Sequence, residues 1–362
     1  MDWGHGGPHS GCMENLAGSL AGDEFAPRST YLNTASTGLI PARAVTAIHE
    51  AMQSVADGAP VDMFADVEAA RESYARLAGV PVRQVATGAS VATFVGLIAT
   101  SLPSGAEVLT AEGDFSSAVN PFHMRADLKV RMVPLERLAE SVRPDTALVS
   151  VSAVQSADGR IADLPALRTA AAAHGARTCI DVSQGLGWLD FDASDYDFTV
   201  DVAYKWLMSP RGVAFLTVPE DFGGLIPAFA GWVAGEHPFD NCYGPVAELA
   251  HSARRFDESP SLHSFTGARH SLALVEEIGA ETVRAHNLAL ADRFRAGLDR
   301  LGIEPVPAPG SAIVSVPQLG HRQAALLDAG LVTSERAGNL RAAFHLYNAA
   351  ADVDRLLDAL SG

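Results

Sequence analysis

The strongest constraint on the fold is a regular alternation of strand-like and helical segments through the middle of the chain. Apolar, β-branched runs typical of strands fall at residues 106–111, 128–133, 146–151, 177–181, 197–203 and 212–218. Apolar residues at helical spacing occupy residues 90–101, 116–125 and 163–174. Strands that alternate with helices pair mainly in parallel, and the helices cover both faces of the sheet. We therefore predict an α/β fold whose functional site lies at the carboxyl ends of the strands.

The segments that flank this region predict a second, smaller domain. An earlier helix should begin near Pro41, whereas residues 219–262 are rich in Gly, Pro and aromatics and look irregular. Beyond them we expect a long helix at 266–301, short strands at 311–316 and 339–343, and a final helix at 349–361. The predicted organisation is a disordered tail (1–24), a large domain (25–255) whose first residues could pack with the small domain, and a small α+β domain (256–362).

Composition excludes several classes of protein. With 362 residues and 48% hydrophobic content, the chain can bury a large core, yet it has no apolar run long enough to span a membrane. The formal charge of −17 disfavours nucleic acid and anionic membranes as partners. The start of the chain lacks a basic, apolar secretion signal, so we expect a cytoplasmic protein.

The cysteines and the first histidines give no metal prediction. Cys12, Cys179 and Cys242 are too far apart for a disulfide framework or a zinc site. His5 and His9 have spacings from Cys12 that a metal could use, but the Gly- and Pro-rich chain around them cannot preorganise ligands. We therefore predict no metal.

Only two lysines occur among the 26 Lys and Arg residues of the chain, and Lys205 is the more informative. A lysine amine can condense with a carbonyl group, whereas the guanidinium of arginine stays protonated. Lys205 stands in an apolar segment just beyond a predicted strand, which is unusual for a solvated lysine. Lys129 alternates with apolar residues and is expected on the outward face of an edge strand.

Asp181 ends the predicted strand 177–181, and Lys205 follows the next predicted strand, 197–203. An acid for a pyridine nitrogen and an amine for an aldehyde are the two groups that a pyridoxal 5'-phosphate (PLP) enzyme needs. We therefore predict PLP as the cofactor. Gln184 is placed to bond the ring's phenolic oxygen, and the small Ser183 would let the face of the ring approach closely. Taken alone, Asp181 could equally cap a turn.

Two further segments fit the same cofactor. Ala89 and Ser90 stand between a strand end and a helix start, where free amides and the helix dipole favour a phosphate. Ser90 alone is more simply explained as a helix N-cap. Phe115 follows the next predicted strand and could stack on the pyridine ring, or it could be a core residue.

Arg341 lies in a predicted strand of the small domain. Its planar fork could bind a substrate carboxylate through two hydrogen bonds, although an arginine taken alone is more often structural.

Five separated motifs resemble the class V aminotransferase family of fold type I PLP enzymes. They are Tyr31-Leu32-Asn33-Thr34-Ala35-Ser36, Gly88-Ala89-Ser90, Asp181-x-Ser183-Gln184-x-x-Gly187, Tyr204-Lys205-Trp206 with Pro210-Arg211-Gly212, and Arg341-x-Ala343-x-x-x-Tyr347-Asn348. The resemblance runs from about Tyr31 to the C-terminus. It implies that Lys205 forms a Schiff base with PLP, that Asp181 contacts the pyridine nitrogen, and that Arg341 holds the substrate carboxylate.

The resemblance implies further contacts with the cofactor and the substrate. Ser156 stands where desulfurases have an Asn near the ring oxygen, and Tyr204 matches the kynureninase Tyr on the phosphate. Trp232 resembles a kynureninase dimer-face segment, and Ser259 lies in a segment that reaches across a dimer to the partner's phosphate. Together they imply a homodimer with shared active sites. Ala35 and Ser36 would line the substrate pocket.

Within the family, the chain departs from the cysteine desulfurases, because residues 320–340 contain no Cys that could take up sulfur. The segments 204–210 and 341–348 most resemble the carbon–sulfur lyases of ergothioneine biosynthesis. The resemblance therefore implies a C–S β-lyase that cleaves a cysteine S-conjugate, hercynylcysteine sulfoxide, to pyruvate, ammonia and a sulfenic acid. An aminotransferase, a kynureninase-like hydrolase and a catalytically silent PLP-binding protein remain as alternatives.

Overall fold

The computed structural model describes residues 18–361, which divide into two compact units. The larger unit holds residues 37–156 and 160–280, and the smaller holds residues 18–36, 157–159 and 281–361. The cysteine and histidines considered above for a metal, Cys12, His5 and His9, lie outside the described residues, as does most of the predicted tail. Of that tail, Leu20 donates a backbone hydrogen bond to Leu346 (2.8 Å) and residues 22–24 form a 3₁₀ turn.

The larger unit is built on a seven-stranded sheet in the order β2-β8-β7-β6-β5-β3-β4. Its strands are β2 (Val85–Gly88), β3 (Glu107–Ala111), β4 (Lys129–Val133), β5 (Thr146–Ser152), β6 (Arg177–Asp181), β7 (Phe198–Val202) and β8 (Ala214–Thr217). Every neighbouring pair is parallel except β7–β8 and β2–β8, so β8 alone in this sheet runs against the others. The predicted mainly parallel sheet is confirmed.

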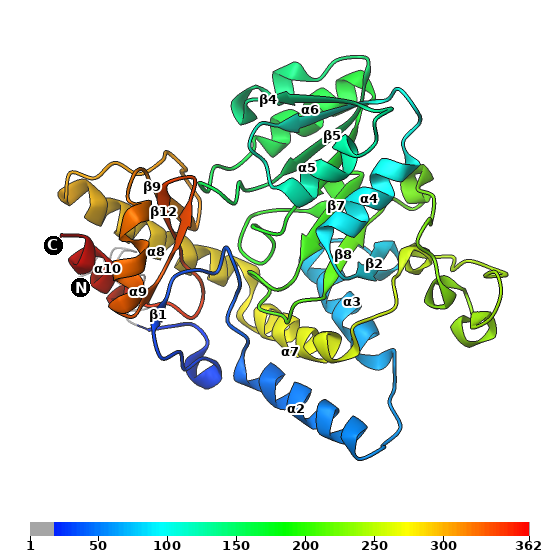
Figure 1. Cartoon of the computed structure of the whole chain (residues 1–362), viewed down its shortest axis with the longest axis horizontal. Helices are drawn as coiled ribbons and strands as arrows, with labels where there is room; N and C mark the ends of the chain where they lie inside the picture. Colours follow the sequence, from blue (N-terminus) through cyan, green and yellow to red (C-terminus); the bar gives the residue numbers. More distant parts are fainter. Residues whose placement is uncertain (1–17, 362) are drawn as a thin grey trace, which may run out of the picture. The chain divides into compact units, whose positions relative to one another are not determined.

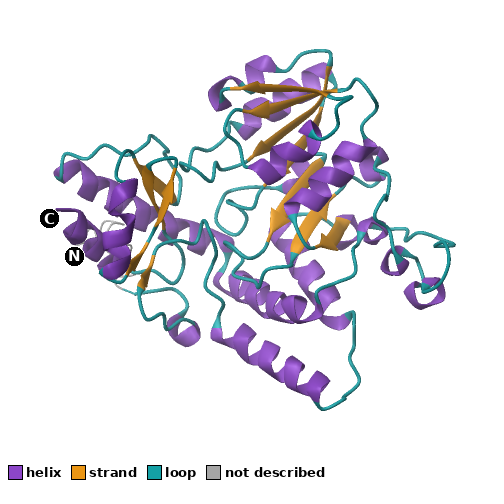
Figure 2. Cartoon of the chain, in the orientation of Figure 1, coloured by secondary structure: helices purple, strands orange, loops and turns teal. Residues whose placement is uncertain are grey.

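Helices cover the two faces of this sheet (Figures 1 and 2). They are α3 (Ala65–Ala78), α4 (Val91–Ser101), α5 (Ser116–His123), α6 (Leu164–His174) and α7 (Leu262–Ile278), whereas α2 (Ala42–Ala56) packs on α7. On one face, Phe94 of α4 packs with Phe198 and Leu216 of the sheet. On the other face, the ring of Phe215 stacks on Tyr74 of α3 with centroids 4.0 Å apart. Both faces of the sheet are thus buried, which explains why its strands are apolar almost throughout.

Local signals fix the ends of these helices. The Ser90 hydroxyl accepts a hydrogen bond from the amide of Thr93 (3.3 Å) at the start of α4, and Asp163 caps α6 in the same way. Gly175 ends α6 with a φ of 68°, a left-handed conformation that glycine adopts without strain. The N-terminus of α4 therefore begins directly after β2, at the edge of the sheet where the site was predicted.

The smaller unit has its own core between two small sheets and three helices. Its elements are β1 (Thr30–Tyr31) paired with β10 (Leu331–Val332), the sheet β11 (Ser334–Arg336), β12 (Asn339–Ala343) and β9 (Ile313–Val316), and the helices α8 (Ala280–Arg300), α9 (Gln323–Asp328) and α10 (Ala350–Ser361). Phe294 of α8 packs against Phe344 next to β12, with ring centroids 5.5 Å apart. The predicted small α+β architecture is present.

The remaining elements are short 3₁₀ helices that join the main segments. They are η2 (Gly22–Glu24), η3 (Val82–Gln84), η4 (Leu135–Arg137), η5 (Ala139–Ser141), η6 (Ala193–Asp195), η7 (Phe222–Gly224), η8 (Trp232–Ala234), η9 (Pro238–Asn241), η10 (Ala253–Phe256) and η11 (Gly320–Arg322). Four of them lie in the segment 219–262, which was predicted to be irregular. Among the described residues, no helix is long and apolar enough to cross a membrane.

Three differences from the predicted elements concern the helices α3, α7 and α8. Helix α3 was not predicted, because its buried face mixes alanines with the polar residues Arg71 and Ser73 and gives little apolar contrast. The single helix expected over 266–301 is two helices, since Gly279 has a φ of 85° and separates α7 from α8. Because α7 packs on α2 and α3, residues 256–280 belong to the larger unit, whereas the sequence placed them in the small domain.

Lys129 is exposed at the start of the edge strand β4, as predicted. The neighbouring strand starts are held together by Glu107, a buried carboxylate on β3. Glu107 accepts hydrogen bonds from Arg131 (3.0 Å), Thr146 (2.8 Å) and Arg143 (3.1 Å). Burial raises the pKa of Glu107, but the bonds to Arg131, Arg143 and Thr146 outweigh it and bring the pKa from 4.5 to about 2.

Replacing Glu107 with Gln should lower the free energy of unfolding by about 2 kcal/mol at neutral pH, because two ion pairs to a buried carboxylate are lost. The pKa of Glu107 is lower in the folded chain, so its contribution is complete above pH 4.5 and disappears as the pH falls to about 2. Denaturant unfolding of both proteins at several pH values measures this difference. Glu140→Gln, which removes an exposed pair with Arg137, is the matched control and should change stability by less than ~0.5 kcal/mol.

Candidate active site

Lys205 lies in a tight loop after β7 and is only 6% exposed. The loop is pinned by Gly38, whose amide donates to the carbonyl oxygen of Tyr204 (2.8 Å). A Cβ atom at Gly38 would stand 2.0 Å from the Lys205 carbonyl oxygen, so only glycine allows this approach. Met208, with a φ of 53°, completes the turn. The sequence therefore folds the lysine inward, away from bulk water.

Asp181 ends β6, the strand next to β7, and is likewise buried. Its Oδ1 accepts a hydrogen bond from the amide of Ser183 (2.9 Å), and the Ser183 hydroxyl accepts one from the amide of Val202 (3.1 Å). Gln184 accepts a hydrogen bond from the indole of Trp206 through its Oε1 (2.8 Å). The loop that carries Asp181 is thus bonded directly to the loop that carries Lys205.

Electrostatics couple Asp181 to Lys205. Burial raises the pKa of Asp181, while the charge of Lys205 and the hydrogen bonds of Ser183 lower it and offset part of that shift. A second acid, Asp201 on β7, is also buried, and its Oδ2 has no hydrogen-bond partner in the described structure. Burial and the neighbouring Asp181 raise the pKa of Asp201 well above its usual value. The negative charge of this acid pair is therefore held on Asp181.

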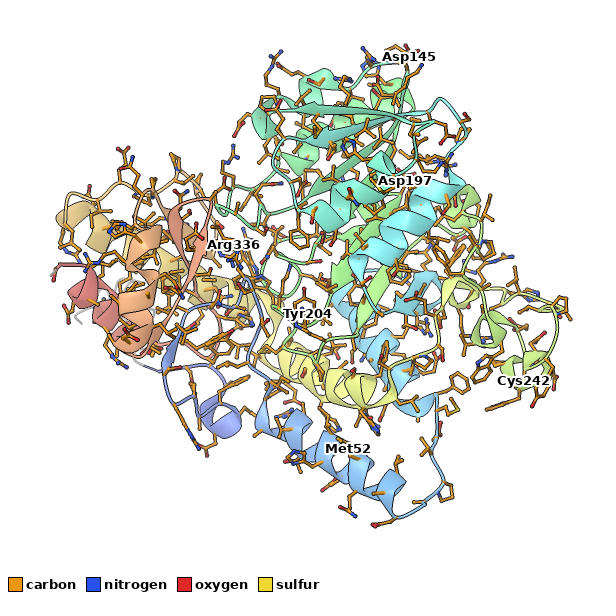
Figure 3. The ribbon with its side chains drawn as sticks, in the orientation of Figure 1. Met52, Asp145, Asp197, Tyr204, Cys242 and Arg336 are labelled. Carbon is orange, nitrogen blue, oxygen red and sulfur yellow. The ribbon has the colours of Figure 1, made fainter. Side chains whose placement is uncertain are left out.

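Two aromatic rings flank the amine of Lys205. The Phe115 ring centroid lies 5.3 Å from the Lys205 Nζ, and the Tyr204 ring centroid lies 5.8 Å from it. Phe115 is 43% exposed just before α5 and is therefore not a core residue. The Tyr204 ring also stacks on Arg211, whose guanidinium carbon is 4.1 Å from the ring centroid. Figure 3 marks Tyr204 in the larger unit.

Ala89 and Ser90, at the junction between β2 and α4, were predicted to bind phosphate. In the structure a carboxylate side chain of the protein is bound at this junction. The amide of Ala89 donates to Oε2 of Glu258 (2.9 Å). The preceding residue, Asp257, accepts from the amide of Thr87 (2.8 Å) and forms a buried ion pair with Arg71 (2.6 Å). Sequence reasoning missed Glu258, because nothing in a local pattern connects it to residues so far away in the chain.

Three other predicted cofactor residues lie on separate loops. Ser156 is in a turn closed by a hydrogen bond from the Gln155 amide to the Arg160 carbonyl (2.8 Å). Trp232 begins η8, and its ring packs against Phe64 with centroids 6.0 Å apart. Ser259 is exposed, directly after Glu258. Their predicted contacts with the cofactor remain predictions.

The predicted substrate residues Ala35, Ser36 and Arg341 belong to the smaller unit. Arg341 is 1% exposed on β12, where its Nη2 donates to the Ser36 hydroxyl (2.7 Å) and its Nε donates to the Ser334 hydroxyl (3.0 Å). Burial, and next the positive charge of Arg336, lower the pKa of Arg341 to about 9, so it remains a cation at neutral pH. Ala35 is buried beside Ser36. A buried guanidinium next to hydroxyl groups suits a carboxylate ligand.

The residues of the larger unit fit the predicted cofactor. A buried amine stands near a buried carboxylate, as an aldehyde and a pyridine nitrogen require, and an exposed aromatic ring flanks the amine. The amide at the start of α4 holds a carboxylate, which shows that this helix N-terminus accepts an anion. Phosphate, ring and aldehyde can each be assigned to side chains that this unit supplies.

Residues 30–356 match the aminotransferase class-V family, and the chain belongs to it. It is therefore an enzyme of a PLP-dependent family, and PLP is its cofactor, as predicted. The fold is that of fold type I PLP enzymes, also as predicted.

Relatives in the family differ in activity. The chain is 29% identical to isopenicillin N epimerase of Streptomyces clavuligerus over 92% of this chain and 94% of that protein. It is 28% identical to kynureninase of Deinococcus radiodurans over 61% of this chain and 56% of that protein. Among solved structures, a cystine C–S lyase in complex with cysteine persulfide superposes with a TM-score of 0.84 at 22% identity, covering 92% of this chain and 97% of that chain. This structural likeness establishes the fold.

Lys205 should be the residue that links covalently to the cofactor. Borohydride reduction of the holoenzyme, followed by peptide mapping, should recover the cofactor on Lys205, and Lys205→Ala should lose the visible absorption band and turnover. Lys129→Ala is the matched control and should keep both, because Lys129 is exposed at the sheet edge. Recovery of the label on Lys129 would end the assignment.

Glu258 should compete with the cofactor phosphate for the amide of Ala89. Because two anions cannot share one donor without repulsion, Glu258→Gln should bind PLP about 10-fold more tightly, measured by titrating apoprotein with PLP and following the cofactor absorbance. Pyridoxal, which lacks the phosphate, should bind both proteins equally. Glu248→Gln removes an exposed carboxylate from the same segment and should leave both affinities unchanged.

Proposed function

We propose that this enzyme is a PLP-dependent carbon–sulfur β-lyase that acts on a cysteine S-conjugate sulfoxide, with hercynylcysteine sulfoxide as the substrate. The observation that carries the proposal is the buried Lys205 in a chain whose described residues include no cysteine suited to accept sulfur. The C–S lyase among the similar structures supports the same reaction class.

The cysteines disfavour the desulfurase alternative. Residues 320–340 contain no Cys. Cys179 is buried inside β6, and burial raises the pKa of its thiol to about 12, so little thiolate is present at neutral pH. Cys242 is exposed in the irregular segment of the larger unit, after η9, and Figure 3 marks it there. Cys12 lies outside the described residues. Elimination that leaves sulfur on the departing group needs no thiolate from the protein.

Each chemical task of a β-elimination would fall to a residue of this chain. Arg341 would bind the α-carboxylate through its buried guanidinium. Lys205 would take the proton from the substrate Cα, because a neutral amine held out of water is an effective base. Asp181, whose negative charge Lys205 favours, would keep the pyridine nitrogen protonated. PLP, when bound, supplies the electron sink that stabilises the negative charge at Cα.

The overall reaction balances with water as the only co-substrate. Loss of the Cα proton and cleavage of the Cβ–S bond, whose electron pair leaves with sulfur, give a sulfenic acid once sulfur's oxygen is protonated. The three-carbon remainder reacts with water to give pyruvate and ammonia. No oxidant or reductant is consumed in this step.

The site also supports a homodimer with shared active sites as the active form. Ser259 is exposed, next to a residue that contacts the phosphate-site amide, which suits a side chain that reaches a partner. Mixing inactive Lys205→Ala chains with inactive Ser259→Asp chains should restore part of the activity, because a mixed dimer retains one site with both residues intact. A fully active monomer in sedimentation would contradict the shared site.

A panel of cysteine conjugates tests the lyase reaction. Hercynylcysteine sulfoxide should release pyruvate with a kcat/KM at least ~10-fold above S-methylcysteine sulfoxide and L-cysteine, and Lys205→Ala should release none. Equal efficiencies would reject the specific substrate. Persulfide on the protein after reaction with L-cysteine would indicate a desulfurase. Exchange of the Cα proton with D₂O and inversion of configuration without pyruvate would indicate an epimerase, and alanine from kynurenine a hydrolase. A keto acid that accumulates together with the aminated cofactor would indicate an aminotransferase.

A further inference from the structure

A second arginine shares the hydroxyl group that binds Arg341. Arg336 ends β11, the strand that pairs with β12, and is labelled in Figure 3. Its Nη2 donates to the Ser36 hydroxyl (2.9 Å), the same oxygen that accepts from Arg341 (2.7 Å). Two guanidinium groups therefore lie within two hydrogen-bond lengths of each other, in one unit of the protein.

Arg336 has no counter-ion in the part of the chain that the structure describes. Its other hydrogen bond goes to a neutral group, the carbonyl oxygen of Glu335 (2.6 Å). The Glu335 carboxylate instead accepts from the amide of Gly338 (2.5 Å) at the turn between β11 and β12. Because neighbouring residues of a strand point to opposite faces, that carboxylate is directed away from the Arg336 guanidinium.

Such an arrangement is unfavourable without a ligand. Arg341 is buried, and the charge of Arg336 lowers its pKa further, which is the sign of repulsion between the two cations. One carboxylate compensates one positive charge. A ligand with two acidic groups would compensate both, and Arg336 is exposed whereas Arg341 is buried.

We propose that Arg336 determines substrate specificity by binding a second acidic group, one carried by the sulfur-linked part of the substrate. Arg341 holds the α-carboxylate, and Arg336 selects cysteine conjugates that carry an acidic group in addition to the α-carboxylate. This proposal rests on the proposed lyase function, whose substrate carries a second carboxylate on its betaine end. Until substrate binds, Ser36 holds both guanidinium groups through its two acceptor lone pairs.

Two conjugates of equal shape and different charge provide the test. They are S-(2-carboxyethyl)-L-cysteine sulfoxide and its neutral amide, S-(2-carbamoylethyl)-L-cysteine sulfoxide. The wild-type enzyme should favour the acid in kcat/KM by on the order of 10- to 100-fold. Arg336→Gln should abolish this preference by raising KM for the acid alone, with kcat nearly unchanged. Arg336→Lys should keep part of it, since it retains the charge and loses the planar fork.

Arg300→Gln, which removes an exposed charge at the end of α8, is the control and should keep the full preference. Arg341→Lys should weaken both conjugates equally. If Arg336→Gln lowers kcat/KM equally for both conjugates, Arg336 binds the α-carboxylate. If kcat/KM is unchanged for both, the Arg336 side chain is merely solvated. Either result would overturn the proposal.

A binding measurement separates this proposal from the lyase function. The α-methyl analogues of both conjugates have no Cα proton to lose, so their affinity follows from the change in cofactor absorbance without turnover. The wild-type protein should bind the acid analogue 10- to 100-fold more tightly than the amide analogue. Arg336→Gln should bind the two analogues with equal affinity. If no conjugate releases pyruvate but this difference remains, the lyase function fails and the role of Arg336 stands. If pyruvate is released and the difference is absent, Arg336 has no such role.

Discussion

The attraction between the buried Lys205 and Asp181 is the interaction on which the rest of the larger unit depends. Both groups are almost without contact with water, and burial disfavours their charged forms, but the attraction to Lys205 offsets part of the rise that burial causes in the pKa of Asp181. Their positions follow from the parallel pairing of β6 and β7, which brings two strand ends to one edge of the sheet. The close contact between Gly38 and the Lys205 carbonyl oxygen then keeps the lysine loop in place. The sheet thus determines which side chains meet, and the loops determine which way they face.

The buried Asp201 helps to keep the negative charge of the site on Asp181. Two acids buried near one another cannot both ionise without large repulsion, so their first negative charge goes to the member with the better partners. Asp181 has Lys205 and Ser183, whereas Oδ2 of Asp201 has no hydrogen bond in the described structure. A neutral Asp201 therefore leaves one negative charge opposite one amine, and the site stays electrically balanced over the range in which Asp201 remains protonated.

Most of the fold could be predicted from sequence because parallel strands buried on both faces are apolar throughout, a signal that survives without tertiary information. Helix α3 could not, since its buried face mixes alanines with Arg71 and Ser73 and gives no clear apolar stripe, and the break at Gly279 is one glycine among 32. In the site, Lys205, Asp181 and Phe115 could be predicted because each follows a strand at the same sheet edge. Glu258, Asp201 and Arg336 could not, because their importance comes from contacts with residues distant in the sequence or from burial alone.

Both positions that we propose to bind anions are occupied by side chains of the chain itself. Glu258 bonds the amide at the start of α4, and Ser36 bonds the two guanidinium groups of the smaller unit. These internal contacts keep the donors oriented and avoid buried, unpaired polar groups. Binding of phosphate or carboxylate is then an exchange of partners, so its net free energy is the difference between two sets of hydrogen bonds. The exchange differs between the positions, because phosphate must displace a charged group, whereas a carboxylate replaces a neutral hydroxyl. Displacing the internal partner should therefore cost less free energy when substrate binds than when the cofactor binds, because Glu258 is charged and Ser36 is neutral.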